Sequence, residues 1–223
     1  MITVTLEHHA MLFADIAREA IVCFGNKGES AILEGIRRYG ERRGKRMAER
    51  TGNDHVPNDL VAYLVYSEID TSLNTLKIIQ KTPYLHVNVT DCAWYKTWQK
   101  FDVIKYGCLY CRVVDDAILQ GFNPEFRFAV NGTLSNGGDH CEFHYYDGSM
   151  NWINGIRYYW MRRQVGNRAR RSFAFHTADL YDALSTILIE RFGEMGKQAV
   201  DSALSKFQQQ FGFLVPTEPL SKL

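Results

Sequence analysis

Apolar residues recur every three or four positions at both ends of the chain, which predicts amphipathic helices there. Residues 8–24 carry an apolar helical face, and Gly25 follows as a residue that commonly ends a helix. A second helix begins after Gly28, and its other face is basic: Arg37, Arg38, Arg42, Arg43, Lys45, Arg46 and Arg50. We expect this face to be solvated and partly neutralised by nearby glutamates, although it could also hold a phosphate or a carboxylate.

The middle of the chain mixes strand and helix patterns. Residues 84–90 alternate and are rich in β-branched side chains, which predicts a strand, whereas the apolar residues 60–69 fit either a strand or a short helix. A helix is expected over residues 101–119, started or interrupted near Gly107. Alternating stretches at 125–134 and 140–146 flank a Ser-Asn-Gly-Gly turn and predict a β-hairpin.

The last third of the chain repeats the pattern of the first. At an offset of 168, residues 176–207 match residues 8–39 without a gap, and both copies contain an FGxxG turn. We interpret this as a duplicated helix pair. The predicted fold is therefore α+β, with helix hairpins at both chain ends packed around a central antiparallel β-hairpin or sheet. Residues 1–147 are expected to form an α+β domain, followed over 148–223 by a basic linker and the second helix pair, and the two could pack as one domain.

Composition narrows the class of protein. A net charge of +1 over 223 residues argues against a dedicated nucleic-acid binder. Five cysteines, an odd number in a chain of this length, indicate free thiols in a reducing compartment. The first residues lack the basic start and apolar run of a signal peptide, and no stretch reaches the roughly 20 apolar residues of a membrane helix. We expect a cytoplasmic protein without nucleic-acid or membrane partners.

Thiols, acids and imidazoles are concentrated between Cys108 and Tyr145. Cys111 and Asp115 are one helical turn apart and should share a helix face. On the strand that follows, Cys141 and Phe143 should share one face, and the other face holds His140, Glu142 and His144. A thiol beside an acid or imidazole is the minimum for nucleophilic catalysis, because the thiolate is the reactive form. Alternatively, the acids orient a water molecule and the thiols shape the pocket.

A metal site competes with this interpretation. The soft ligands available for tetrahedral zinc are Cys108, Cys111, His140, Cys141 and His144. Strand alternation points Cys141 away from both histidines, so these ligands do not all converge. We therefore predict no metal in this group.

The ordered set of motifs resembles the L-2-amino-thiazoline-4-carboxylic acid hydrolase family. The resemblance rests on VTDC ending at Cys92, on CRVVD from Cys111 to Asp115, on Pro124, and on GGDHCEF with Asp139 and Cys141. The FGxxG turn and the YGERRG stretch also resemble the opening helices of that family. The similarity covers roughly residues 10–147, and the C-terminal repeat lies outside it.

This resemblance implies hydrolysis of a small cyclic amidine-like C–N or C–S bond, of the 2-aminothiazoline-carboxylate type, to an N-carbamoyl amino acid. No organic cofactor is implied. For this chemistry we expect Cys111 or Cys141 to attack, or to position the water, while Asp115 and Asp139 transfer protons. The substrate-binding residues are expected to be Cys92, Asp116, His140 and Arg157. An arginine from 157–171 or from the basic helix would hold the substrate carboxylate.

A different class of function stays open alongside hydrolysis. The chain could be a non-catalytic small-molecule or metal-binding module, because its GxxCxF turn also resembles vinyl-reductase-type ligand-binding domains. Paired acids beside thiols favour the enzyme, since a sensor needs only a pocket. The exposed helix hairpins are compatible with a homodimer.

Overall fold

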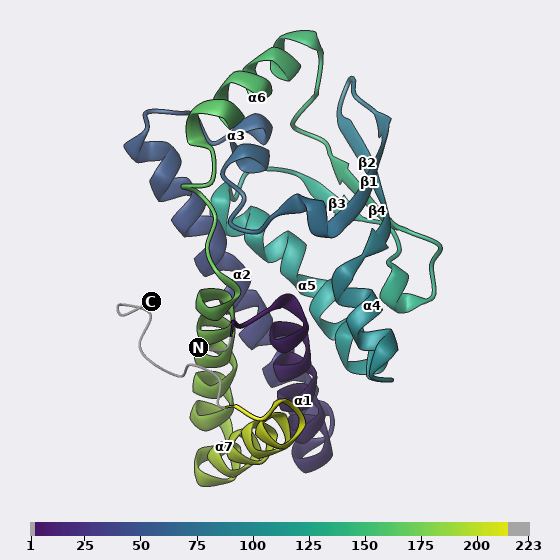
Figure 1. The fold of residues 1–223 in the computed structure, drawn as a ribbon, viewed down its shortest axis with the longest axis vertical. Coiled ribbons are helices and arrows are strands. Elements are labelled where there is room, and N and C mark those ends of the chain that lie inside the picture. The colour runs from purple at the N-terminus through teal and green to yellow at the C-terminus, as the bar shows by residue number, and fades with distance from the viewer. Residues whose placement is uncertain (1–2, 214–223) are drawn as a thin grey trace. The chain divides into compact units, whose positions relative to one another are not determined.

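A computed structural model describes residues 3–213 and has the predicted α+β class, with helices at both ends and a four-stranded antiparallel sheet (Figure 1). Two short 3₁₀ turns, η1 (Thr71–Leu73) and η2 (Leu134–Asn136), connect larger elements. In chain order those elements are α1 (Leu6–Phe24), α2 (Asn26–Asn53), α3 (Leu60–Val65), β1 (Asn74–Gln80), β2 (Leu85–Cys92), α4 (Ala93–Lys100), α5 (Ile104–Phe122), β3 (Phe128–Val130), β4 (Cys141–Tyr145), α6 (Trp152–Val165) and α7 (Phe173–Phe211).

The chain divides into two compact units, each built from separated segments. Unit 1 comprises the residues up to Tyr39, Ala93–Val114 and the residues from Ser172 onward. Unit 2 comprises Gly40–Cys92 and Asp115–Arg171. Both copies of the helix pair therefore belong to unit 1, and the whole sheet belongs to unit 2. The predicted domain boundary at residue 147 stays a prediction.

The two helix pairs of unit 1 have the same local geometry. Gly25 has φ 56° and ψ −134°, and Gly193, 168 residues later, has φ 57° and ψ −133°. These dihedrals lie in a region that only glycine adopts readily, so each pair bends at the same point. A Cβ on Gly28 or on Gly196 would lie 2.1 Å from the carbonyl oxygen eight residues earlier, so both positions also need glycine for close packing.

The core of unit 1 joins the two copies. Helix α1 packs along α7 (Figure 1), and Phe24 stacks on Phe192 with ring centroids 3.8 Å apart. The fully buried His9 places Nδ1 3.3 Å from the Thr177 hydroxyl and Nε2 3.4 Å from the Tyr110 hydroxyl. Because buried polar groups need hydrogen-bond partners, these contacts specify how α1, α5 and α7 pack.

Unit 2 is built on a sheet with strand order β1-β2-β4-β3. Cross-strand partners in the central pair are His86 with His144, Val87 with Phe143, and Val89 with Cys141. One face of this pair is apolar. Its residues Leu85 and Val87 form a core together with Leu60, Leu119 and Phe126. Pairing of β3 with β4 confirms the predicted hairpin, and the apolar stretch at 60–69 forms the short helix α3.

Two segments differ from the sequence predictions. The predicted linker contains a helix, α6, whose start is capped by the Asn151 side chain accepting from the Asn154 N–H. Its aromatic residues are exposed on several sides, with Trp152 76% and Trp160 56% accessible, so it lacks the periodicity that predicts a helix. Strand β1 was not predicted because neither of its faces is buried and alternation is absent.

The basic face of α2 is also not simply solvated. Arg46 holds the fully buried Glu68 through two hydrogen bonds of 3.1 and 3.0 Å, and Arg50 lies 3.1 Å from the same carboxylate. Arg43, itself buried, places Nε 3.9 Å from Glu68. The expectation of a solvated face is therefore wrong for these three arginines. A buried carboxylate needs charged partners, and α2 supplies them.

Candidate functional site

Asp115 is the most perturbed acid of unit 2. It lies on α5, half-buried, and its surroundings raise its pKa from 3.8 to about 6. Desolvation by burial is the main cause, since it disfavours the charged carboxylate. The Arg43 charge acts in the opposite direction, and the neighbouring Asp116 raises the pKa further. A carboxyl with this pKa can both accept and donate a proton near neutral pH.

Two tyrosines lie within the electrostatic reach of Asp115. Tyr63 on α3 and Tyr145 on β4 place their ring centroids 6.1 Å apart. Burial raises the pKa of both phenols, and the Asp115 charge raises them further. Both side chains therefore stay neutral and can donate hydrogen bonds. Helix α3, helix α5 and strand β4 thus each contribute one of three interacting polar side chains in unit 2: Tyr63, Asp115 and Tyr145.

Cys141, the first residue of β4, belongs to the same group. Burial raises the pKa of its thiol to about 11, and the charges of Cys92 and Asp115 act in the same direction. The Leu134 N–H lies 3.4 Å from Sγ and favours the thiolate, but less strongly than burial disfavours it. At neutral pH the thiol is therefore protonated, and it reacts as a nucleophile only if a base removes its proton.

The remaining predicted site residues are distributed more widely. Cys111 lies on the unit 1 part of α5, one turn before Asp115, and is half-buried. Asp139 is exposed and His140 half-buried in the segment before β4. Arg157 on α6 forms an ion pair with Asp59. The cation whose charge acts on Asp115 is thus Arg43 rather than Arg157.

Sequence reasoning missed two members of this group, Tyr63 and Tyr145, and offered Arg43 only as one of several arginines of the basic helix. Tyr145 alternates with Cys141 and Phe143 along the strand, so strand periodicity alone could have placed it on their face. Tyr63 and Arg43 come from α3 and α2, and only the tertiary fold brings them near Asp115. We name Arg43, Tyr63, Asp115, Cys141 and Tyr145 the inner cluster.

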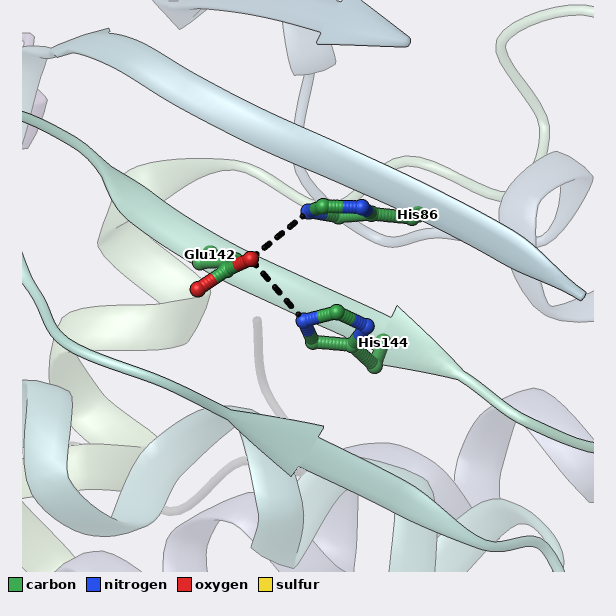
Figure 2. Close-up of side chains that lie close together, drawn as sticks. All are labelled: His86, Glu142 and His144. Atoms are coloured by element: carbon green, nitrogen blue, oxygen red, sulfur yellow. Dashed lines mark ion pairs between the residues drawn. The ribbon is translucent and has the colours of Figure 1, made fainter. Parts of the chain in front are cut away.

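The opposite face of the same strands carries a different set of side chains. Figure 2 shows His86 of β2 together with Glu142 and His144 of β4, which we name the outer cluster. Glu142 Oε1 lies 3.1 Å from Nε2 of each histidine. Among residues 3–213, this is the group whose nitrogen and oxygen atoms come close enough to share a metal ion.

The outer cluster includes only one of the ligands that the sequence suggested for zinc. As predicted, Cys141 and His144 face opposite sides of the sheet, since Cys141 is on the buried side with Val89. The Cys108 thiol donates to the carbonyl oxygen of Lys105, 3.0 Å away. His86 was missed because a cross-strand partner is set by register, which a single strand's pattern does not contain.

Comparison with known proteins assigns the chain to a family. No curated protein and no solved structure matches it. Within residues 3–213 no helix is long and apolar enough to cross a membrane. The sequence model described as L-2-amino-thiazoline-4-carboxylic acid hydrolase matches residues 5–145, more than half of the chain, and that range includes the whole inner cluster. The protein therefore belongs to the L-2-amino-thiazoline-4-carboxylic acid hydrolase family.

Proposed function

We propose that this protein opens a small cyclic amidine of the 2-aminothiazoline-carboxylate type and releases an N-carbamoyl amino acid. Family membership supports the class of hydrolase. The observation that carries the proposal is Asp115, a carboxyl with a pKa of about 6 beside a neutral thiol and two neutral phenols. An acid with that pKa is suited to a reaction in which protons must be both removed and delivered.

The reaction consumes one water molecule. Its oxygen bonds to C2 of the ring as the π electrons of the C2–N double bond pass to the ring nitrogen. The carbonyl then forms, and the electrons of the C2–S bond pass to sulfur. One proton of the water reaches that sulfur and the other reaches the ring nitrogen, which gives a thiol and a carbamoyl group. Asp115 removes a proton from the attacking water and returns it to the leaving sulfur.

In this proposal Cys141 shapes the site rather than attacks. Its thiol has a pKa of about 11, so at neutral pH very little thiolate is present. Direct attack by Cys141 would first need Asp115 to take its proton. Because water is the final nucleophile in either route, attack by water directed by Asp115 is the shorter sequence of steps.

The other members of the inner cluster bind the substrate. Arg43 is buried and its charge acts on Asp115, so we assign it to the carboxylate of the substrate, which its guanidinium can hold through two hydrogen bonds. Tyr63 and Tyr145 donate hydrogen bonds to the ring nitrogen or the developing oxygen. Cys92 and Asp116 complete the surroundings of Cys141 and Asp115, respectively.

Mass-detected ring opening of L-2-amino-thiazoline-4-carboxylate by the purified protein tests the proposal. We expect the wild type to form the N-carbamoyl product. We expect Cys141→Ser and Cys111→Ser to keep turnover within about tenfold, because neither thiol is the attacking atom in this route. Cys23→Ser is the matched control, since Cys23 is an exposed thiol outside the inner cluster.

The outcomes separate the functions that stay open. Loss of product in one cysteine variant, with a covalent substrate adduct trapped on that thiol in the wild type, would overturn attack by water and establish a thiol nucleophile. Substrate binding without product, measured by calorimetry, would overturn the hydrolase and leave a binding module. Neither binding nor turnover across a panel of cyclic amidines would reject this substrate class.

A further inference from the structure

The outer cluster lies on a face of the sheet that the proposed hydrolysis does not use. His86 and His144 are cross-strand partners, and Glu142 precedes His144 by two residues on the same strand face. Figure 2 shows both imidazole rings turned so that a nitrogen of each faces the Glu142 carboxylate. The two rings stack with centroids 4.2 Å apart and planes inclined by 23°. Strand alternation places Cys141 and Tyr145 of the inner cluster on the other side of the sheet.

His144 carries an unmet hydrogen-bonding requirement. The residue is only 8% exposed, and neither ring nitrogen has a hydrogen-bond partner among residues 3–213. Glu142 Oε1 is 3.1 Å from Nε2, which is an ion-pair distance, but the angle is not that of a hydrogen bond. A buried polar side chain without a partner is costly, and it indicates a group that binds there.

The chemistry of the three donors matches a transition metal. Two imidazole nitrogens and one carboxylate oxygen lie within 4.8 Å of one another, with Glu142 Oε1 3.1 Å from each nitrogen. Ligands bonded to one zinc ion at about 2.1 Å are roughly 3–3.5 Å apart, so Glu142 Oε1 is already at a suitable distance from each imidazole nitrogen. Imidazole and carboxylate together suit zinc and iron(II), whereas calcium and magnesium require mostly oxygen ligands.

We infer that the outward face of β2 and β4 binds a divalent first-row transition-metal ion, with Zn²⁺ as the reference ion, through His86, Glu142 and His144. Three protein ligands leave at least one coordination position for water or a small anion, which is the arrangement of reactive rather than purely structural zinc sites. The inference stands apart from the proposed hydrolysis, because it uses none of the residues of the inner cluster.

Neighbouring side chains are placed to support such a site. Asn88 Oδ1 lies 3.1 Å from His86 Nε2, where it can hydrogen-bond to a metal-bound water or add an oxygen ligand. Tyr84 and Tyr146 lie against His144, with ring centroids 5.9 and 5.7 Å from the imidazole. Outer contacts of this kind fix the orientation of ligating rings.

Equilibrium dialysis of the full-length protein against Zn²⁺, followed by elemental analysis, tests the inference. We expect one ion per chain in the wild type and a loss of affinity of at least 100-fold in His144→Gln, because even loss of an outer-shell partner costs 10–100-fold. His140→Gln is the matched control: it removes an imidazole four residues away that is not in the cluster, and it should bind as the wild type does.

Two further measurements keep the result independent of folding and of activity. Zn²⁺ should raise the melting temperature of the wild type but not of His144→Gln, whose far-ultraviolet circular dichroism should match the wild type. The Co²⁺ form should show visible bands of nitrogen and oxygen ligation without a thiolate charge-transfer band. Equal binding by wild type and His144→Gln, no binding by either, or a thiolate band that vanishes in cysteine variants would each overturn the site.

Discussion

Two carboxyls, one in each unit, have the same shifted pKa but different neighbours. Asp15 on α1 is 1% exposed and Asp115 on α5 is half-buried, and desolvation raises the pKa of each to about 6. Asp15 forms a direct ion pair with Arg18 one helical turn away, and the Lys206 charge also acts on it. Asp115 instead lies within electrostatic reach of a thiol and two phenols.

The difference shows that a shifted pKa alone does not mark a functional site. Asp15 is part of a helical unit whose acids have direct partners, as Glu19 has in the Lys206 ammonium and the Ser202 hydroxyl. Asp115 is close to side chains that can donate, accept or react, and among residues 3–213 it has no direct ion-pair partner of the kind that Asp15 has in Arg18. The neighbours, rather than the magnitude of the shift, assign chemistry to Asp115.

The largest expected effect is on activity, which should fall on removal of the Asp115 carboxyl but not of the Asp15 carboxyl. Asp115→Asn should lower kcat for ring opening by about 10²–10⁴-fold, the range for loss of a general acid–base group. Asp15→Asn should change kcat by less than about threefold, because that carboxyl lies outside the inner cluster. Steady-state kinetics on both variants make the comparison. Equal losses would mean that Asp115 acts through stability rather than chemistry.

A second prediction concerns the stability that a buried counter-charge provides. Arg43 links the two carboxyls involved, because its charge acts on both Asp115 and the buried Glu68. Glu68→Ala should lower the free energy of unfolding by about 3–5 kcal/mol, since three arginines would lose a buried counter-charge. Denaturant unfolding measures this. In the control Glu34→Ala, which breaks an exposed ion pair with Arg191, the cost should stay below about 1 kcal/mol.

Stability should also depend on pH through Asp115. A pKa raised from 3.8 to about 6 means that the folded protein favours the protonated acid. This contribution is fully present below pH 3.8 and is lost as pH rises through about 6, where ionisation costs up to about 3 kcal/mol at 1.4 kcal/mol per pKa unit. Asp115→Asn should therefore be more stable than the wild type at pH 8 and no more stable at pH 3.5, as measured by denaturant unfolding at both pH values.

The smallest expected effect is the difference in stability between the two acid-to-amide variants. Asp15→Asn also removes an acid with a pKa of about 6, and that pKa already includes the attraction to Arg18 and Lys206. The gain in unfolding free energy at pH 8 should therefore match that of Asp115→Asn to within about 1 kcal/mol, as measured by denaturant unfolding. A clearly smaller gain for Asp15→Asn would show that the ion pair with Arg18 stabilises the ionised acid more than its pKa indicates.

Local periodicity predicted the parts of this protein that depend on neighbouring residues in the chain. The α+β class, the repeated helix pair and the opposite orientations of Cys141 and His144 all follow from helix and strand periods. Exposed elements were missed for the same reason: β1 and α6 do not bury a single face, so no pattern marks them.

Features set by tertiary pairing could not be derived in this way. His86 opposes His144 only because β2 and β4 pair in one particular register. Glu68 is buried among Arg43, Arg46 and Arg50, which lie 18 to 25 residues earlier in the sequence. The sequence does not indicate whether the counter-charge of a charged residue will be buried beside it, so charge patterning alone predicts a solvated basic face for α2.

The repeated helix pair also has a consequence for how the chain folds. His9 and Thr177, which meet in the core of unit 1, are 168 residues apart in sequence. Closing so long a loop costs more chain entropy than forming contacts between neighbours, and such contacts usually form late. During synthesis every residue of unit 2 is made before α7, so the apolar face of α1 stays uncovered until α7 has been made. Assembly of the helical framework is therefore expected to be the slow step of folding and the stage most open to aggregation.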